Sequence, residues 1–319
     1  MLMKRFFLLI LMLGVFACSR TQGKRTHGND ETTSLEVKEE LPAELNVQLE
    51  AMGYPAPEKR TRHLSPKENP YENADLASHM DDIPATFVFL DVNRDIQLVH
   101  NRDRAVTRFS PCSTYKIPNT LIALDTGVMK NAESKIPWDK KKYPKQPFWD
   151  DLKTQFGLNW ETDHTLESAF QNSCVWCYTE IAEQIGLARM QKYISRFNYG
   201  NMDIDSGAQP FWLDSSLQIS AVEQVSFLKR FVQNDLGLSE PAVQNARRVF
   251  KREQKNDATL YAKTGSGNNI GWFVGFVEAG TNQYIFAFNM DKNAFSKEAF
   301  ARKRISIPTG ILAELGVWL

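Results

Sequence analysis

The segment Ser113-Thr114-Tyr115-Lys116 places a hydroxyl and an amine three residues apart. On a helix that spacing brings both side chains to one face. A serine hydroxyl is a weak nucleophile that needs a base within hydrogen-bond reach, and a desolvated lysine can be that base. The pair therefore predicts nucleophilic catalysis by Ser113 with Lys116 as its base. Alone it is a weak signal, because an exposed serine and lysine on any helix have the same spacing.

Two further polar motifs follow along the chain, Ser173-Cys174-Val175 and then Lys263-Thr264-Gly265. Three such motifs in this order are hard to produce by chance. Together they resemble the serine acyl-transferases that act on penicillins, in which Ser-x-x-Lys, a Ser-centred triplet and Lys-Thr-Gly form one site.

The finer pattern resembles the class D (oxacillinase-type) β-lactamases over roughly residues 70 to 319. The second motif is Ser-x-Val rather than Ser-Asp-Asn, and further elements stand where that family has its next signatures. These elements are Tyr199-Gly200-Asn201, Phe211-Trp212-Leu213 and Gly271-Trp272-Phe273-Val274-Gly275. The resemblance implies hydrolysis of β-lactams, penicillins and oxacillin-type compounds among them, through an acyl-enzyme on Ser113.

Lys116 must be neutral to act as a base, although an ordinary lysine with a pKa of ~10.4 is charged at pH 7. Burial in apolar surroundings lowers the pKa of a lysine by several units. The resemblance further implies that Lys116 is carbamylated to N6-carboxylysine by carbon dioxide or bicarbonate, and that the carbamate serves as base for acylation and deacylation. It implies that Val175 and Leu213 form a dry wall and that the Trp212 indole N–H bonds the carbamate. The other interpretation makes Val175 and Trp212 plain core.

Two backbone N–H groups are expected to stabilise the oxyanion. Ser113, at the start of a helix, directs its own N–H into the site, and the resemblance supplies the N–H of Ser266 as the second donor. The resemblance also makes Ser173 the residue that relays a proton to the leaving nitrogen of the opened ring. By itself, a serine in Asn-Ser-Cys would indicate a helix cap.

The substrate carboxylate is expected to meet the lysine and threonine of Lys263-Thr264-Gly265, carried on an edge strand with its side chains alternating. Arg304 aligns with the family arginine that grips this carboxylate bidentately. Its basic neighbours Arg302 and Lys303 leave that alignment open.

The N-terminus has the pattern of an export signal. Met1 to Arg5 is basic, and Phe6 to Ala17 is an apolar run too short to cross a bilayer as a helix. The end of the run, Val15-Phe16-Ala17-Cys18, resembles a bacterial lipobox, so residues 1–17 are expected to be a lipoprotein signal peptide and Cys18 to be lipidated. An ordinary cleaved signal with an incidental cysteine is the alternative. Either interpretation predicts an exported, periplasmic protein, and the first anchors it to a membrane.

Residues 18–70 are interpreted as a tether or linker, partly disordered. Ser19 to Ser34 contains no large apolar residue and cannot bury enough surface to fold alone. A short amphipathic helix is possible after it, and prolines then interrupt the chain. The helix would use Leu41, Leu45, Leu49 and Met52. The catalytic domain is expected over residues 71–319.

Lysine plus arginine and aspartate plus glutamate both number 38, so the formal net charge is zero. That balance gives no support for nucleic-acid binding, which usually shows as a basic face. The hydrophobic fraction of 42% is ample for one sizeable core. We expect a small-molecule β-lactam as substrate and no cofactor beyond carbon dioxide. The oligomeric state stays open.

The expected fold class is α/β of the α+β type: an antiparallel sheet formed by both chain ends, packed with helices. An opening hairpin is predicted at Thr86 to Val92 and Ile96 to His100, joined by the turn residues Asn93-Arg94-Asp95. A mostly helical region follows from about 110 to 235. Three more strands are predicted at Thr259 to Thr264, Ile270 to Glu278 and Gln283 to Met290. The last helix is predicted to begin near Ile307, with Pro308 in its first turn and Gly316 as its cap. The resemblance implies the same fold, that of the penicillin-recognising β-lactamases and transpeptidases.

Cys112, Cys174 and Cys177 adjoin the site serines. Because Ser113 and Ser173 should meet, Cys112 can approach Cys174 or Cys177, and export permits a disulfide. Cys174-x-x-Cys177 also matches a redox or zinc half-site superficially. No second pair or clustered histidine completes it in the sequence, so buried thiols without a metal are the favoured interpretation.

Three other functions compete with hydrolysis. A β-lactam sensor domain shares these motifs but acylates and stops, and such receptors carry several membrane spans ahead of the sensor. A peptidoglycan D,D-transpeptidase or carboxypeptidase would use D-alanyl-D-alanine termini, against which Ser-x-Val and the Trp212 segment weigh. A structural lipoprotein with a dead site is disfavoured because no motif residue is missing.

Overall fold

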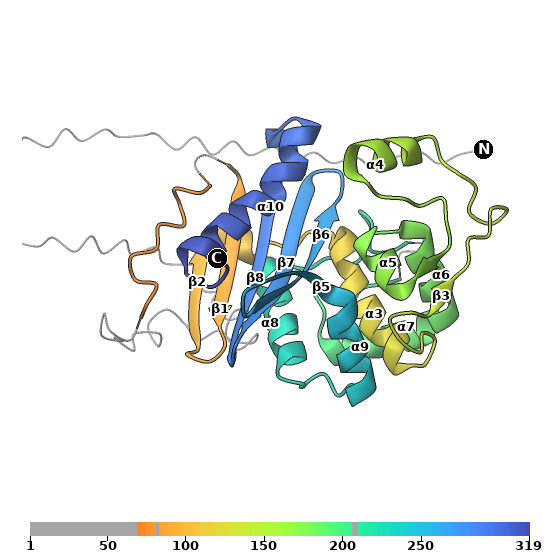
Figure 1. The fold of residues 1–319 in the computed structure, drawn as a ribbon, viewed down its shortest axis with the longest axis horizontal. Helices are drawn as coiled ribbons and strands as arrows, with labels where there is room; N and C mark the ends of the chain where they lie inside the picture. The colour runs from red at the N-terminus through yellow and green to blue at the C-terminus, as the bar shows by residue number, and fades with distance from the viewer. Residues whose placement is uncertain (1–68, 81–82, 206–209) are drawn as a thin grey trace, which may run out of the picture. The chain divides into compact units, whose positions relative to one another are not determined.

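The computed structural model describes residues 69–80, 83–205 and 210–319. Its centre is an antiparallel sheet with the order β2-β1-β8-β7-β6-β5, in which a strand from early in the chain lies beside the last strand (Figure 1). The strands are β1 Ala85–Asp91, β2 Ile96–His100, β5 Lys251–Lys255, β6 Ala258–Ser266, β7 Ile270–Ala279 and β8 Asn282–Asp291.

The sheet is buried on both faces, which is why its central strands carry apolar residues at nearly every position. The C-terminal helix α10, Lys297–Glu314, packs against β7 and β8 on one face (Figure 1). Its partners there include Phe273, Phe286 and Phe288. The helix α8, Ala221–Val232, contacts β1, β7 and β8. A capping box between Ser220 and Glu223 starts α8 at its first turn.

The remaining helices bring the second and first motifs to the sheet. Helix α3, Lys116–Asp125, contacts α6, Val175–Ile185, and α9, Glu240–Phe250, while α9 in turn contacts β6. Their neighbours are α2 Arg102–Val106, α4 Phe148–Phe156, α5 Leu166–Gln171, α7 Leu187–Phe197 and the two-stranded ribbon of β3 Lys135–Ile136 and β4 His164–Thr165.

The expected fold class is confirmed, as are the opening hairpin and the three late strands, each within two residues at either end. The start of the last helix is wrong. Helix α10 begins at Lys297 behind the cap Ser296, whose hydroxyl accepts from the Ala299 N–H, and Pro308 lies inside it. Proline favours a first turn but does not require one, and burial of α10 against the sheet outweighs one lost hydrogen bond. Gly316 does follow the helix end, with a φ of 71°.

Helix α9 and strand β5 are elements that the sequence analysis did not predict. Residues 1–68 lie outside the described part of the chain. The signal peptide, the lipidation of Cys18 and the tether with its short helix therefore stay predictions. Among the residues that are described, no helix combines the length and apolarity needed to cross a membrane.

Candidate active site

The first motif forms the expected pair. A short 3-10 helix over Cys112–Tyr115 runs directly into α3, so Ser113 and Lys116 lie one turn apart. Lys116 Nζ is 3.1 Å from Ser113 Oγ, within hydrogen-bond distance. Cys112 enters the turn with a φ of 50°, a left-handed conformation that non-glycine residues seldom adopt. The backbone is therefore strained immediately before the nucleophile candidate, as is common at functional sites.

The amine of Lys116 is completely buried. Its Nζ lies 5.2 Å from the centre of the Tyr178 ring, and burial lowers the pKa of Lys116 to about 7. No carboxylate pairs with Lys116 in the part of the chain that the structure describes. Tyr178 is therefore a side chain placed against this amine, and nothing in its sequence position identified it.

The second motif meets the third. Ser173 lies between α5 and α6 with a φ of 52°, and its Oγ accepts a hydrogen bond of 3.0 Å from Lys263 Nζ. The helix-cap interpretation of Ser173 is wrong, because Cys174 is the N-cap of α6. Lys263 also donates to the carbonyl oxygen of Thr264 at 3.1 Å. Burial, and then the charge of Lys116, hold the pKa of Lys263 well below its ordinary value. The three motifs thus form one connected cluster.

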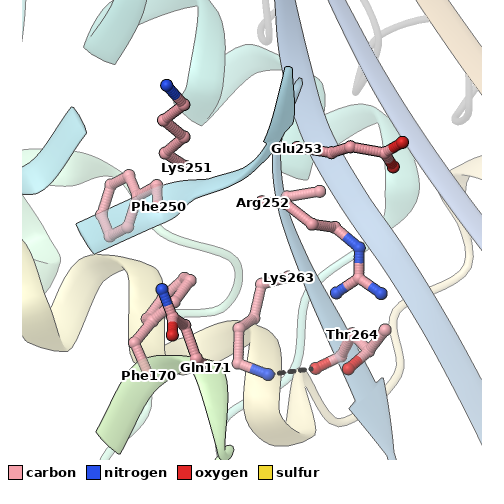
Figure 2. Close-up of a pocket in the computed structure, with 9 residues that line it drawn as sticks. Phe170, Gln171, Phe250, Lys251, Arg252, Glu253, Lys263 and Thr264 are labelled. Carbon is pink, nitrogen blue, oxygen red and sulfur yellow. Dashed lines mark hydrogen bonds between the residues drawn. The ribbon is translucent and has the colours of Figure 1, made fainter. Parts of the chain in front are cut away.

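Strand β6, which carries Lys263, is not the edge strand that the sequence analysis expected. Strand β5 pairs with it and occupies the edge. The charged, irregular sequence of β5 has no apolar alternation to identify it as a strand. Beside the cluster lies a pocket of about 480 Å³ (Figure 2). Its walls include Phe170, Gln171, Phe250, Arg252, Lys263 and Thr264.

Arg304 reaches the third motif from α10. Its Nη1 donates a hydrogen bond of 2.8 Å to the carbonyl oxygen of Gly265, while its buried Nε has no partner among the described atoms. Arg302 is exposed and Lys303 lies over the ring of Phe295, so Arg304 is the basic residue of this run that lies at the motif. Burial is the main reason that its pKa falls to about 10.

The glycine of the third motif permits close packing. A Cβ on Gly265 would lie 3.0 Å from the Pro111 carbonyl oxygen and 3.1 Å from Thr114 Cγ2. Strand β6 therefore approaches the nucleophile turn at a distance that only glycine allows without displacement of its neighbours. Ser266, the next residue, ends β6 and is exposed.

Trp212 is fully buried and stacks on Tyr115, with ring centres 5.2 Å apart. Its indole Nε1 has no hydrogen-bond partner among the described residues, which is unusual for a buried donor. Val175, at the first position of α6, and Leu213 are only half-buried.

The Trp212 segment is held by Ser110, a residue that the sequence analysis missed. Ser110 Oγ donates to the carbonyl oxygen of Trp212 at 2.9 Å and accepts from the N–H of Asp214 at 2.9 Å. The carbonyl oxygen of Ser110 accepts from Trp272 Nε1 at 2.9 Å. The only signal in the sequence is its place three residues before Ser113.

The Tyr199-Gly200-Asn201 segment is joined by hydrogen bonds to the residues that follow the Trp212 segment. The Asn201 N–H donates to the carbonyl oxygen of Gln218, and its side chain donates to that of Ser216. Gly200 has a φ of 58°, and a Cβ there would collide with the Gln218 backbone. These bonds join residues on either side of Trp212 in the sequence.

The preferred interpretation of the cysteine pair is wrong. Cys174 and Cys177 form a disulfide, with Cα atoms 5.4 Å apart, while Cys112 is a buried free thiol whose pKa burial raises to about 12. His164 does lie beside the pair, with a ring nitrogen within 4.8 Å of both sulfurs. This neighbour could not be seen in the sequence, since the chain separates it from the pair. Because the sulfurs bond each other, they are not free to hold a metal.

Comparisons with known proteins show which family this chain resembles in sequence and fold. The family described as "Penicillin binding protein transpeptidase domain" matches residues 66–308. The chain is 36% identical to Beta-lactamase OXA-48 of Klebsiella pneumoniae, over 75% of this chain and 90% of that protein. It is 37% identical to the Probable beta-lactamase YbxI of Bacillus subtilis (strain 168), over 66% of this chain and 75% of that one. The solved class D β-lactamase YbXI from Nostoc superposes with a TM-score of 0.69 at 33% identity, over 77% of this chain and all of that one.

Proposed function

The chain belongs to the class D β-lactamases, serine enzymes that hydrolyse β-lactams, and we propose that Ser113 is its nucleophile and a carbamate on Lys116 its general base. The observation that carries this proposal is the fully buried amine of Lys116, 3.1 Å from Ser113 Oγ, with no carboxylate partner among the described residues. A neutral amine in this position is a nucleophile for carbon dioxide. The reaction forms one N–C bond, releases one proton and leaves an anionic carbamate.

Two features of the surroundings support the carbamate. Its negative charge would lie near Lys263, whose charge already interacts with Lys116. The unpartnered indole N–H of Trp212 is a buried donor available to an anionic oxygen. A buried polar group without a partner costs about 1–3 kcal/mol, so an acceptor there is favourable.

Acylation then follows from the hydrogen bonds of the site. The base on Lys116 takes the proton of Ser113 Oγ as this oxygen attacks the β-lactam carbonyl. The N–H groups of Ser113 and Ser266 are the proposed oxyanion donors. The C–N bond of the ring breaks as Ser173 relays the proton: its hydroxyl gives a proton to the leaving nitrogen and regains the one that the base took from Ser113, so the base returns to its anionic form. Lys263, which donates to Ser173 Oγ, orients that hydroxyl and favours release of its proton.

Deacylation uses the same base a second time. The carbamate takes a proton from a water molecule, whose oxygen attacks the Ser113 ester. The ester bond breaks, Ser113 Oγ regains a proton and the penicilloate leaves. During both steps the substrate carboxylate is held by Lys263, Thr264 and Arg304. Oxacillin-type penicillins are the proposed preferred substrates.

The test of this proposal is single-turnover mass spectrometry with a penicillin, with and without added bicarbonate. We expect an acyl adduct on Ser113 that clears faster when bicarbonate is present. A stable adduct in both conditions would favour a β-lactam sensor or a transpeptidase, and absence of any adduct would reject Ser113 as nucleophile.

The same assay between pH 5 and 9 should show a deacylation rate that depends on pH through the titration of Lys116. Because the pKa of Lys116 is lowered to about 7, the amine is protonated and unreactive toward carbon dioxide below pH 7 and neutral above it. Without added bicarbonate, deacylation should therefore slow as the pH falls through 7 and recover when it rises. A deacylation rate that is constant from pH 5 to 9 would contradict a base formed from this amine.

Trp212→Phe should lower carbamylation and slow deacylation more than acylation. Phenylalanine retains the stacking against Tyr115 but lacks the indole N–H. Removal of one donor to an anionic group typically costs about 1.5–3 kcal/mol, roughly ten- to a hundredfold. The carbamate can be counted by incorporation of labelled bicarbonate, and high bicarbonate should restore much of the rate. Equal loss in acylation and deacylation would rule out this role for Trp212.

Export to the periplasm, and a lipid anchor on Cys18, remain part of the proposal. Their support is the basic, apolar and lipobox-like pattern of residues 1–18.

A further inference from the structure

Arg252 lies at the open edge of the sheet, next to the site. It occupies a β-bulge, because Lys251 pairs with Tyr261 and Glu253 with Leu260 while Arg252 has no paired residue on β6. Bulges near active sites commonly re-aim a side chain. Here the side chain crosses β6, since its guanidinium carbon lies 5.5 Å from the centre of the Phe273 ring on β7.

That position brings the guanidinium to the threonine of the third motif. Thr264 is paired with Phe273 across β6 and β7, so both side chains share a face of the sheet. Figure 2 shows Arg252 running from β5 toward Thr264, while Lys251 on the same strand points away. Both Arg252 and Thr264 line the pocket beside the catalytic cluster.

Three cations, Arg252, Lys263 and Arg304, lie close enough for their charges to interact. The charge of Arg252 contributes to the lowered pKa values of both Lys263 and Arg304, after the larger effect of burial. In the described part of the chain, none of the three forms an ion pair with a carboxylate. Burial lowers the pKa of Arg252 and the charge of Glu253 opposes this effect, but the Glu253 carboxylate forms no ion pair with Arg252 and lies 3.9 Å from Lys255 Nζ.

Protection of the sheet edge does not explain this arrangement. Charged residues on an edge strand deter pairing with another chain, and that is sufficient for Lys251, Glu253 and Lys255. Such residues act by pointing into water. Arg252 is exposed like its neighbours, but its guanidinium turns across the neighbouring strand toward two other cations, Lys263 and Arg304, and no described carboxylate forms an ion pair with any of the three.

We propose that Arg252 is a second guanidinium for the carboxylate of the β-lactam, which it meets from the β5 side while Arg304 meets it from α10. This inference rests on the proposed function, and it adds a specificity residue that the family motifs do not contain. Arg252 would make the site select for anionic substrates and act on binding, not on the acylation chemistry.

The test removes the charge from the protein, by Arg252→Gln, and from the substrate, by esterifying its carboxylate, separately and together. Phenoxymethylpenicillin and its methyl ester are compared on the unchanged protein and on Arg252→Gln, with kcat/KM for acylation of Ser113 measured by mass spectrometry. We expect Arg252→Gln to lower kcat/KM for the acid by about two- to fivefold, the upper part of the range for an exposed ion pair, with kcat unchanged. The ester should respond much less. Lys251→Gln, the matched control from the same strand, should leave the acid-to-ester ratio unchanged.

Each other outcome rejects a defined part of this assignment. An equal loss for acid and ester would make Arg252 a packing residue on Phe273, and no loss for either would make it a surface charge. Arg252→Lys should restore much of the preference for the acid, which a purely structural role would not predict. Absence of an adduct on the unchanged protein would reject the proposed function itself, a result distinguishable from an adduct formed without charge selectivity.

Discussion

Ser113→Ala should abolish β-lactam hydrolysis, with kcat lower by at least about 10⁴-fold, the scale on which loss of a catalytic serine acts in other serine hydrolases. Without Oγ no ester can form, so the acyl adduct should be absent from the mass spectrum. The fold should be unaffected, because Ser113 is half-buried and the described hydrogen bond of its Oγ is the one that it accepts from Lys116 Nζ.

A matched control for that variant is Ser195→Ala. Ser195 is an exposed serine on α7, and its hydroxyl accepts a hydrogen bond from the nearby Gln191 side chain. Its loss should leave kcat and the adduct unchanged. If Ser113→Ala retained a penicillin adduct, another residue would be the nucleophile and the mechanism above would be wrong.

Lys116→Met should have the second largest effect. Methionine fills a similar volume but cannot form a carbamate or accept a proton from Ser113 or water, and a general base contributes about 10²–10⁴-fold to each step it serves. Acylation should slow and deacylation should nearly stop, so an acyl adduct should persist long after the substrate is removed. Bicarbonate should have no effect on its lifetime.

The same variant also has a thermodynamic signature. The pKa of Lys116 is lowered to about 7 in the folded protein and returns to its ordinary value on unfolding. Folding is therefore penalised fully below pH 7, and the penalty falls as the pH rises toward the unfolded value. Lys116→Met should raise the Tm more at pH 6 than at pH 10. Lys192→Met, at an exposed position on α7, is the control and should leave the Tm unchanged at both pH 6 and pH 10. Rapid, bicarbonate-sensitive deacylation by Lys116→Met would show that another group is the base.

Much of the fold could be predicted because local signals there agree with the tertiary outcome. The opening hairpin and the late strands combine apolar or β-branched runs with turn residues, and the structure forms them at those places. Strand β5 could not be predicted in this way. Its Lys-Arg-Glu-Gln-Lys sequence is wholly exposed and becomes a strand only because β6 offers an unpaired edge.

Chain order was enough to identify the family, the serine with its lysine, and the other two motifs, because each requires a fixed residue type at a fixed spacing. Tertiary structure alone decided how these groups interact. The burial of Lys116 under Tyr178, the bond from Lys263 to Ser173 and the tie from Ser110 to Trp212 all join residues remote in sequence. It also decided that Cys174 bonds Cys177 and that Arg252 turns toward Thr264. The sequence gives the types of the side chains and their spacing. Their pKa values and hydrogen bonds depend on the local dielectric and on neighbours that only packing supplies.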